Sequence, residues 1–330
     1  MEDIMSVKSE FLRLLEQNKG RPISGEAVAS ELRCSRAAVN KAAVKLREEG
    51  YSIDAGRNRG YMLSPGSNVL SLEGLKLYLK NPDLKLIFLP ETDSTNLRAR
   101  EAAQQGMPDE TIVVVSRRQT LGRGRRGRSF YSPEGGIYMS ILLRPDIDLA
   151  AGTLLTITSA AAVCKAVEEV CGIKLSVKWV NDLYLNGLKV GGILTEAVTD
   201  FESGNIEYAI VGIGLNVFWE ESDIPEDLRE VAGAICTERS SFEQININAL
   251  AASIVDHVLK DSDDFSVPPL YIERNIVPGH NIIVNEGQKK TKAFALSVEP
   301  DGRLKIREES GDIRLLSYGD ISIEKAQTNF

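Results

Sequence analysis

A glycine- and arginine-rich stretch between two apolar runs constrains the fold more than any other part of the chain. Residues 117–128 contain six arginines and three glycines. This mixture satisfies neither helix nor strand propensity, so we expect a loop. The runs on either side, Thr111–Val115 and Gly136–Leu143, are typical of buried strands. The loop is therefore tethered at both ends.

Such a loop suits an anionic ligand. Glycine lets backbone N–H groups come close to a ligand, and guanidinium groups at its edge favour a phosphate or a carboxylate. The spacing of Gly122, Gly127 and Arg128 approaches that of a P-loop, but that motif requires lysine at this point and a helix directly afterwards. Residues Ser132–Gly136 are typical of a turn instead. An exposed basic loop that contacts nucleic acid, or nothing, is the alternative.

Length and composition indicate a globular protein of two or three domains. The chain has 330 residues, of which 43% are hydrophobic and 26% are charged. The charged N-terminus and the lack of an 18-residue apolar run argue against a signal peptide or a membrane span, so we expect no membrane partner and a cytoplasmic location. Four scattered cysteines and two histidines indicate neither a disulfide framework, nor a zinc site, nor a Ser-His-Asp triad.

The N-terminal region carries a different charge from the rest of the chain. Residues 1–66 hold 11 Lys/Arg and 9 Asp/Glu, a charge of +2, whereas the remainder carries −10. The apolar spacing and the caps Ser24 and Ser35 predict three helices and a hairpin. These elements cover Glu2–Asn18, Gly25–Leu32, Arg36–Glu49, Tyr51–Ala55 and Gly60–Leu63.

Three helices with a tight turn before the third, followed by a basic hairpin, resemble a winged helix-turn-helix domain. In that arrangement the third helix enters the major groove and the hairpin contacts phosphates. The residues expected to bind DNA are Arg36, Asn40, Lys41, Lys45, Arg57 and Arg59. A winged helix used only for protein contacts is the alternative. The turn-rich segment Ser64–Asn68 predicts that this domain covers residues 1–65.

Residues 66–270 alternate strands and helices, and we expect a central α/β domain with a mixed sheet. Asn186-Gly187 is a strong hairpin signal, and Gly212 and Gly214 inside a strand indicate a bulge or a close neighbour. The predicted strands are Lys85–Leu89, Thr111–Val115, Gly136–Leu143, Leu175–Trp179, Leu183–Leu185, Leu188–Val190 and Glu207–Val217. The predicted helices are Ser71–Leu79, Leu97–Gln105, Ala150–Val170 and Asn248–Leu259.

Residues 271–330 contain short alternating segments with turn signals between them. The predicted strands are Asn281–Asn285, Lys292–Val298, Leu304–Glu308 and Ile313–Ser317. They indicate a small C-terminal β-barrel, so the predicted fold class of the whole chain is α+β.

Three segments together closely resemble biotin protein ligases: QTLGRGRRGR at 119–128, KWVNDLYLNGLKVGGILTE at 178–196 and GIGLNV at 212–217. The winged helix narrows the resemblance to the bifunctional, BirA-like class. The resemblance implies a class II synthetase-like central domain and an SH3-like barrel. It also implies that biotin and ATP form biotinoyl-5′-adenylate with Mg²⁺, and that biotin passes to a lysine of a biotin carboxyl carrier protein. The adenylate-bound homodimer would then repress biotin-synthesis genes by binding biotin operon DNA.

The resemblance also assigns roles to single residues. The expected catalytic residues are Lys189, Arg125 and Asp182, and Asp182 is also the expected Mg²⁺-linked carboxylate. The expected biotin-binding residues are Ser94, Thr95, Asn96, Gln119, Arg123, Gly124, Arg125 and Lys189. The expected ATP-binding residues are Arg125, Arg128, Phe130, Lys178, Asn181, Asp182 and Asn216. Phe130 departs from the family, which often has tryptophan there, so its contact with adenine is the weakest of these assignments.

Each assignment has a simpler alternative. Ser94, Thr95 and Asn96 are typical helix caps, Lys189 would be an exposed strand lysine, and Asn181-Asp182 would be a turn. The alternative functions are a ligase for lipoate or another carboxylate, a ligase whose winged helix does not regulate transcription, and a small-molecule-sensing repressor without ligase activity. Because burying the charged loop is costly without a ligand, we also expect it to be disordered in the free protein and to order on binding.

Overall fold

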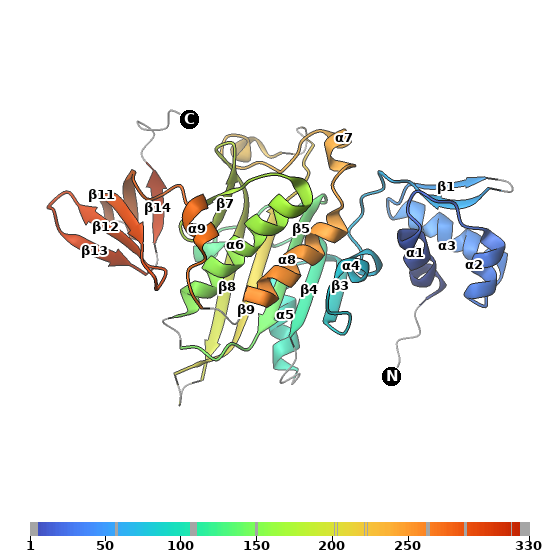
Figure 1. Cartoon of the computed structure of the whole chain (residues 1–330), viewed down its shortest axis with the longest axis horizontal. Coiled ribbons are helices and arrows are strands. Elements are labelled where there is room, and N and C mark those ends of the chain that lie inside the picture. Colours follow the sequence, from blue (N-terminus) through green and yellow to red (C-terminus); the bar gives the residue numbers. More distant parts are fainter. Residues whose placement is uncertain are drawn as a thin grey trace.

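A computed structural model describes residues 6–56, 59–105, 111–148, 151–200, 202, 204–220, 222, 224–261, 265–286, 289–317 and 319–323. An N-terminal helical unit and a C-terminal sheet lie at opposite ends of a central sheet domain (Figure 1). Within these residues, no helix has both the length and the apolar character needed to cross a membrane.

The N-terminal unit has the expected order of three helices and a hairpin. Ser24 and Ser35 cap the second and third helices, each by accepting hydrogen bonds from backbone N–H groups. The elements are α1 (Val7–Gln17), α2 (Gly25–Glu31), α3 (Arg36–Glu48), β1 (Ile53–Gly56) and β2 (Gly60–Leu63). Buried side chains from all three helices and the hairpin, such as Phe11, Leu46 and Leu63, form a separate core. The predicted start of the first helix at Glu2 lies outside the described residues.

The central sheet is mixed, as expected. Its seven strands run in the order β3-β4-β5-β9-β8-β7-β6, with β3 and β4 parallel and all other neighbours antiparallel. The strands are β3 (Lys85–Thr92), β4 (Ile112–Gln119), β5 (Gly136–Leu143), β6 (Ser176–Lys178), β7 (Asp182–Leu185), β8 (Leu188–Thr199) and β9 (Ile206–Asn216). Three predicted strands end too early, because β3 continues past Leu89 to Thr92, β4 continues through Arg117 to Gln119 and β8 continues past Val190 to Thr199. Long neighbouring strands supply the hydrogen bonds that extend them.

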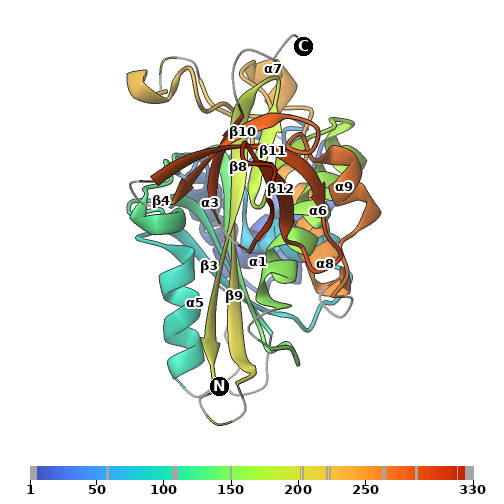
Figure 2. The same ribbon diagram turned by 90° about the vertical axis from the view of Figure 1, so that its left-hand side faces the viewer.

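Helices cover both faces of this sheet. Figure 2 shows α5 on one face and α6 with α8 on the other. The helices of the central region are α4 (Leu72–Tyr78), α5 (Thr95–Gln104), α6 (Gly152–Cys171), α7 (Arg239–Phe242), α8 (Ile247–Asp261) and α9 (Pro269–Arg274). Alternate residues of β4 serve the two cores: Val113 and Val115 pack with α6 and α8, while Ile112 and Val114 pack with α5. An α/β layer structure with a buried sheet results.

The C-terminal region forms an antiparallel five-stranded sheet in the order β13-β12-β11-β10-β14. Its strands are β10 (Asn281–Glu286), β11 (Lys289–Val298), β12 (Leu304–Glu308), β13 (Ile313–Leu316) and β14 (Asp320–Ile323). The sequence pattern does not predict β14. The sheet is tied to the central domain by Trp179, whose Nε1 donates to the carbonyl oxygen of Gly302 at 3.0 Å.

Arg117 joins the N-terminal unit to the central sheet. From β4, its Nε donates to the carbonyl oxygen of Leu70 at 2.7 Å and its Nη2 donates to the hydroxyl of Tyr51 at 3.1 Å. The guanidinium also lies over the rings of Tyr51 and Phe88. The boundaries predicted after residues 65 and 270 remain predictions.

Candidate functional site

An open pocket lies where the central sheet meets the C-terminal sheet, and the space within it and at its mouth amounts to about 1000 Å³. It brings together predicted site residues from three separate parts of the chain. Those that line it are Ser94, Thr95, Asn96, Gln119, Arg123, Gly124, Arg125, Arg128, Phe130, Lys178, Asn181, Asp182 and Lys189. Asn216 is not among the lining residues.

Asn216 is buried on β9 instead. Its Nδ2 donates to the carbonyl oxygen of Gly233 at 3.0 Å, and its Oδ1 is buried without a partner among the described residues. An unpaired buried oxygen is costly and therefore calls for a partner outside the described protein atoms. The predicted contact of Asn216 with ATP stays a prediction.

The glycine- and arginine-rich loop folds back on itself as a short hairpin-like turn. The backbone N–H of Gly124 donates to the oxygen of Arg128 at 2.8 Å, and that of Phe130 donates to Gly122 at 2.8 Å. Left-handed backbone at Arg126 (φ 56°) and Gly127 (φ 73°) makes the turn. Four arginines of this segment, Arg123, Arg125, Arg126 and Arg128, line the pocket. The structure does not test the predicted disorder of the free loop.

The polar end of the pocket lies at the start of α5. Ser94, Thr95 and Asn96 are buried there, although Ser94 makes no side-chain cap. The side chain of Gln119 accepts from the backbone N–H of Thr95 at 2.8 Å, and its Nε2 donates to Ser132 at 3.1 Å. Helix α5 begins at Thr95, two residues before the predicted start at Leu97. These polar side chains therefore face the pocket from the start of the helix.

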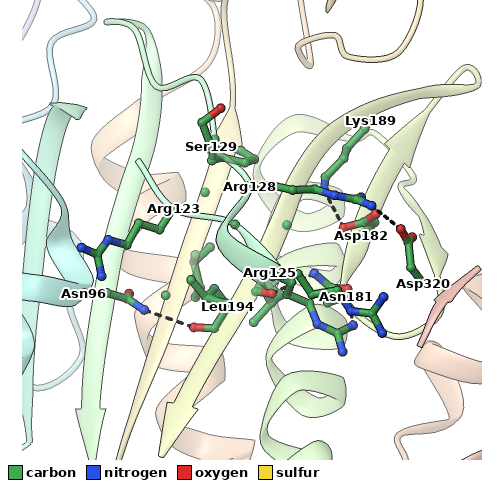
Figure 3. A pocket seen from close by; sticks show the side chains of 18 of the residues that line it. Asn96, Arg123, Arg125, Arg128, Ser129, Asn181, Asp182, Lys189, Leu194 and Asp320 are labelled. Atoms are coloured by element: carbon green, nitrogen blue, oxygen red, sulfur yellow. Dashed lines mark hydrogen bonds and ion pairs between the residues drawn. The ribbon is translucent and has the colours of Figure 1, made fainter. Parts of the chain in front are cut away.

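Lys189 and Asp182 face each other across the β7–β8 hairpin. Their Nζ and Oδ1 atoms are 2.6 Å apart, and Nη1 of Arg125 donates to Oδ1 of Asn181 at 3.1 Å (Figure 3). The predicted Asn186-Gly187 turn closes this hairpin with left-handed residues, φ 51° and 80°. Lys189 is thus paired on one side of the pocket and is not an isolated strand lysine.

The pocket is strongly positive. Six cationic side chains line it, against the two carboxylates of Asp182 and Asp320. Burial lowers the pKa of Lys178 and of Arg125 from their usual values, and nearby Asp182 opposes the shift in both. Partly desolvated cations in excess favour a ligand with several negative charges.

Asp320 and Arg126 show that the C-terminal sheet takes part in the site. Asp320 on β14 pairs with Arg128, as Figure 3 shows, and Nη1 of Arg126 donates to the carbonyl oxygen of Asn285 at 3.3 Å. The sequence patterns did not identify Asp320, because β14 is short and lies far along the chain from the loop. No local spacing signal marks it.

The carboxylates present suit a magnesium ion only in part. No group of three His, Cys, Asp or Glu side chains that could hold a metal occurs in the described parts of the chain. Mg²⁺, however, is commonly bound through one or two carboxylates together with substrate phosphates and water. Asp182, a carboxylate that lines the pocket, meets that weaker requirement.

The predicted DNA-binding side chains lie on the exposed surface of α3. Arg36, Asn40, Lys41 and Lys45 are all exposed. At about 100° per residue, Arg36 and Lys45 lie on the two flanks of the exposed face, which suits a helix seated in a groove. Arg59, at the end of the hairpin turn, is exposed as well, while Arg57 lies outside the described residues.

Comparisons with known proteins agree with this arrangement. The profile of the biotin/lipoate A/B protein ligase family matches residues 88–216, and that of an HTH domain matches residues 8–62. The bifunctional ligase/repressor BirA of Bacillus subtilis (strain 168) is 36% identical over 257 residues, which are 77% of this chain and 76% of that protein. BirA of Escherichia coli (strain K12) is 28% identical over 317 residues, which are 92% of this chain and 94% of that protein.

A solved structure of a biotin protein ligase from Aquifex aeolicus in complex with biotin and ATP is similar to this one. Its TM-score is 0.56 and its sequence identity 28%, and the match covers 73% of this chain and 98% of that one. The predicted winged helix-turn-helix and α/β ligase folds are confirmed. The identity and the coverage of the match to the Bacillus protein are high enough to assign the family. The chain belongs to the biotin/lipoate A/B protein ligase family, within the group of the bifunctional ligase/repressor BirA.

Proposed function

We propose that this protein is a biotin ligase that activates biotin with ATP and transfers it to a lysine of a biotin carboxyl carrier protein, and that it also represses biotin-synthesis genes. In the first step, a carboxylate oxygen of biotin attacks the α-phosphorus of ATP, and pyrophosphate leaves. In the second, the carrier lysine attacks the acyl carbon, and AMP leaves. The observation that carries the proposal is one pocket that joins a buried polar end to a cationic wall.

The cationic wall would lower the main barrier to the first step. A carboxylate and a triphosphate repel each other, and the arginines of the loop, with Lys178 and Lys189, neutralise both. Lys189 would contact the attacking carboxylate and the α-phosphate, and Arg125 would retain the adenylate. Fixed cations also stabilise the charge that develops on phosphorus. Asp182 would hold Mg²⁺, which when bound supplies further neutralisation of the phosphates.

The two ligands would occupy opposite ends of the pocket. Ser94, Thr95, Asn96 and Gln119 would bond the ureido ring of biotin, and Arg123 and Gly124 would surround its acyl chain. Arg128, Phe130, Lys178, Asn181 and Asn216 would contact ATP. The finer fold descriptions, a class II synthetase-like central domain and an SH3-like C-terminal barrel, belong to the same proposal, as does a cytoplasmic location.

Incubation with labelled biotin, MgATP and a carrier domain tests the ligase activity. We expect label on the carrier lysine, and a loss of about 10²–10³-fold in rate for Lys189→Ala. Lys76→Ala, which removes an exposed lysine on α4, should leave the rate unchanged. Lipoate-dependent ATP–pyrophosphate exchange in place of biotin-dependent exchange would favour a lipoate ligase. Binding without transfer would favour a sensor that lacks ligase activity.

Repression would require a dimer that places two winged helices on one operator. Among the described residues β3 is an edge strand of the central sheet, so its outer side can pair with another copy. We propose that adenylate-bound protein dimerises through this sheet. Gel shifts with biotin operon DNA should strengthen when biotin and ATP are both added, and should weaken in Lys41→Ala. If the gel shift is the same with and without biotin and ATP, the result would favour a ligase whose winged helix does not regulate transcription.

A further inference from the structure

Three polar side chains behind the pocket have no role in the proposed chemistry. Glu196 lies on β8, Arg100 on α5 and Ser140 on β5, and none of them lines the pocket. All three are linked to Asn96, which does line it. Ser140 is fully buried and Asn96 is 4% exposed, whereas the side chains of Arg100 and Glu196 are 38% and 29% exposed. The buried pair must therefore find hydrogen-bond partners within the protein.

The amide of Asn96 has only one orientation that satisfies its neighbours. Its Nδ2 donates to Oε2 of Glu196 at 2.9 Å and lies 3.4 Å from the carbonyl oxygen of Leu194 (Figure 3 shows the latter). A carboxylate and a carbonyl can only accept, so the NH₂ group must point to them. Nη2 of Arg100 donates to the other oxygen of Glu196 at 3.1 Å, which holds that carboxylate in place.

The same constraint passes to Thr95. Oδ1 of Asn96 lies 2.6 Å from the hydroxyl of Ser140, and an amide oxygen can only accept, so Ser140 donates its single proton there. The hydroxyl of Thr95 lies 2.7 Å from that of Ser140 and 3.1 Å from Oε1 of Gln119, an amide oxygen that can only accept. Because its single proton is directed to one of these two oxygens, Thr95 presents only lone pairs to a ligand.

We propose that Glu196, held by Arg100, is a positioning residue that fixes Asn96 and, through Ser140, the place of the Thr95 hydroxyl, which acts as a hydrogen-bond acceptor towards the pocket. The polar end would then select ligands that offer N–H donors. This rests on the proposed function and deepens it, because the cyclic urea of biotin offers two N–H groups and the ring of lipoate offers none. Recognition of a donor by a matched acceptor discriminates more strongly than apolar fit.

Glu196→Gln tests the proposal with little change of shape. A glutamine amide both donates and accepts, so only the longer contact with the carbonyl oxygen of Leu194 still orients Asn96, and the hydrogen bond from Arg100 is weakened. We expect the Kd for biotin to rise about 10-fold, with the KM for ATP and kcat at saturating biotin unchanged. Glu207→Gln, an exposed change on neighbouring β9, is the matched control and should behave like the wild type.

A second ligand separates positioning from general loosening of the site. Biotin with one ureido nitrogen methylated lacks one donor, and it should bind the wild type at least about 10-fold more weakly than biotin. In Glu196→Gln this penalty should shrink several-fold. An unchanged Kd for biotin, an equal methylation penalty in both proteins, or a parallel rise in the KM for ATP would overturn the inference. Failure of the wild type itself to bind biotin would instead overturn the proposed function.

Discussion

Two glycines on β9 leave space for side chains that lie at opposite ends of the pocket. A Cβ atom on Gly212 would lie 2.2 Å from Oδ1 of Asn96, and one on Gly214 would lie 2.6 Å from the ring of Phe130. Residues two apart in a strand face the same way, so both glycines line the same floor of the pocket. The sequence analysis predicted a bulge or a close neighbour at these strand glycines. Each glycine does lie against a side chain that is predicted to contact a ligand.

Alanine at these two positions should affect the two substrates separately. Gly212→Ala pushes Asn96 from its place, and we expect the Kd for biotin to rise about 10-fold or more with a smaller change in the KM for ATP. Gly214→Ala displaces Phe130, and we expect the reverse. Isothermal titration with biotin and ATP-dependent exchange kinetics measure the two effects. Gly152→Ala, which meets no atom closer than 3.5 Å, is the control. Equal effects on both substrates would contradict this division of the floor.

Most residues of the candidate site could be predicted from the sequence because they lie in short motifs. Arg125 and Lys189 belong to segments whose order and spacing are characteristic of the family. Asp320 and Glu196 could not be singled out in the same way. Asp320 reaches the pocket only through packing of the C-terminal sheet, and Glu196 matters only because β8, longer than predicted, places it beside Asn96. Neither relation leaves a local pattern.

At the scale of the elements, the cap of α3 is a well-defined test of the N-terminal unit. The hydroxyl of Ser35 accepts from the backbone N–H of Ala38 at 3.1 Å. Ser35→Ala should destabilise α3 by about 1 kcal/mol, because the N–H loses its partner. Hydrogen–deuterium exchange of the α3 amides should then rise about 5-fold. Ser30→Ala, an exposed change inside α2, should leave these amides unaffected, and an equal rise would show that the cap is not responsible.

The glycine- and arginine-rich loop is the element whose conformation should depend most on ligands. Burial lowers the pKa of Arg125, which means that its charge is held at a cost until an anion arrives. We therefore expect trypsin to cleave after Arg123–Arg128 in the free protein, and cleavage to slow about 10-fold when biotin and ATP are both present. Biotin alone should protect less. Cleavage that biotin and ATP fail to slow would count against ordering on binding.

Sequence patterns predicted where elements exist better than where they end. The hairpin at Asn186-Gly187 and strand β5 followed directly from turn and apolar signals. The continuation of β4 through Arg117 did not, because arginine is unfavourable in a strand until a neighbour pairs with it. Here β3 supplies the hydrogen bonds, and Leu70 and Tyr51 take the guanidinium. Tertiary contacts of this kind override local propensity.

At the scale of the whole molecule, a buried acid lies where the N-terminal unit meets the central domain. Glu16 on α1 is 6% exposed. Burial raises the pKa of its carboxyl to about 7, while Lys19 lowers this pKa and Glu73 raises it further. Lys19 in turn donates to the carbonyl oxygen of Ser67, in the segment that leads to the central domain. The protonation of one side chain is thereby linked to the junction of two domains.

The stability of this junction should fall as pH rises through neutrality. The folded state keeps a proton on Glu16 up to a pH of about 7, whereas the unfolded chain loses it near 4.5. Folding therefore takes up a proton between these values, and the contribution of Glu16 decreases across that window by on the order of 3 kcal/mol. Glu16→Gln mimics the protonated form and removes the dependence. In urea unfolding, the variant should match the wild type at pH 5 and exceed its stability at pH 8. Glu48→Gln, an exposed change on α3, is the control and should match the stability of the wild type at both pH values. If the difference in the free energy of unfolding between Glu16→Gln and the wild type does not change with pH, Glu16 is ionised in the folded protein.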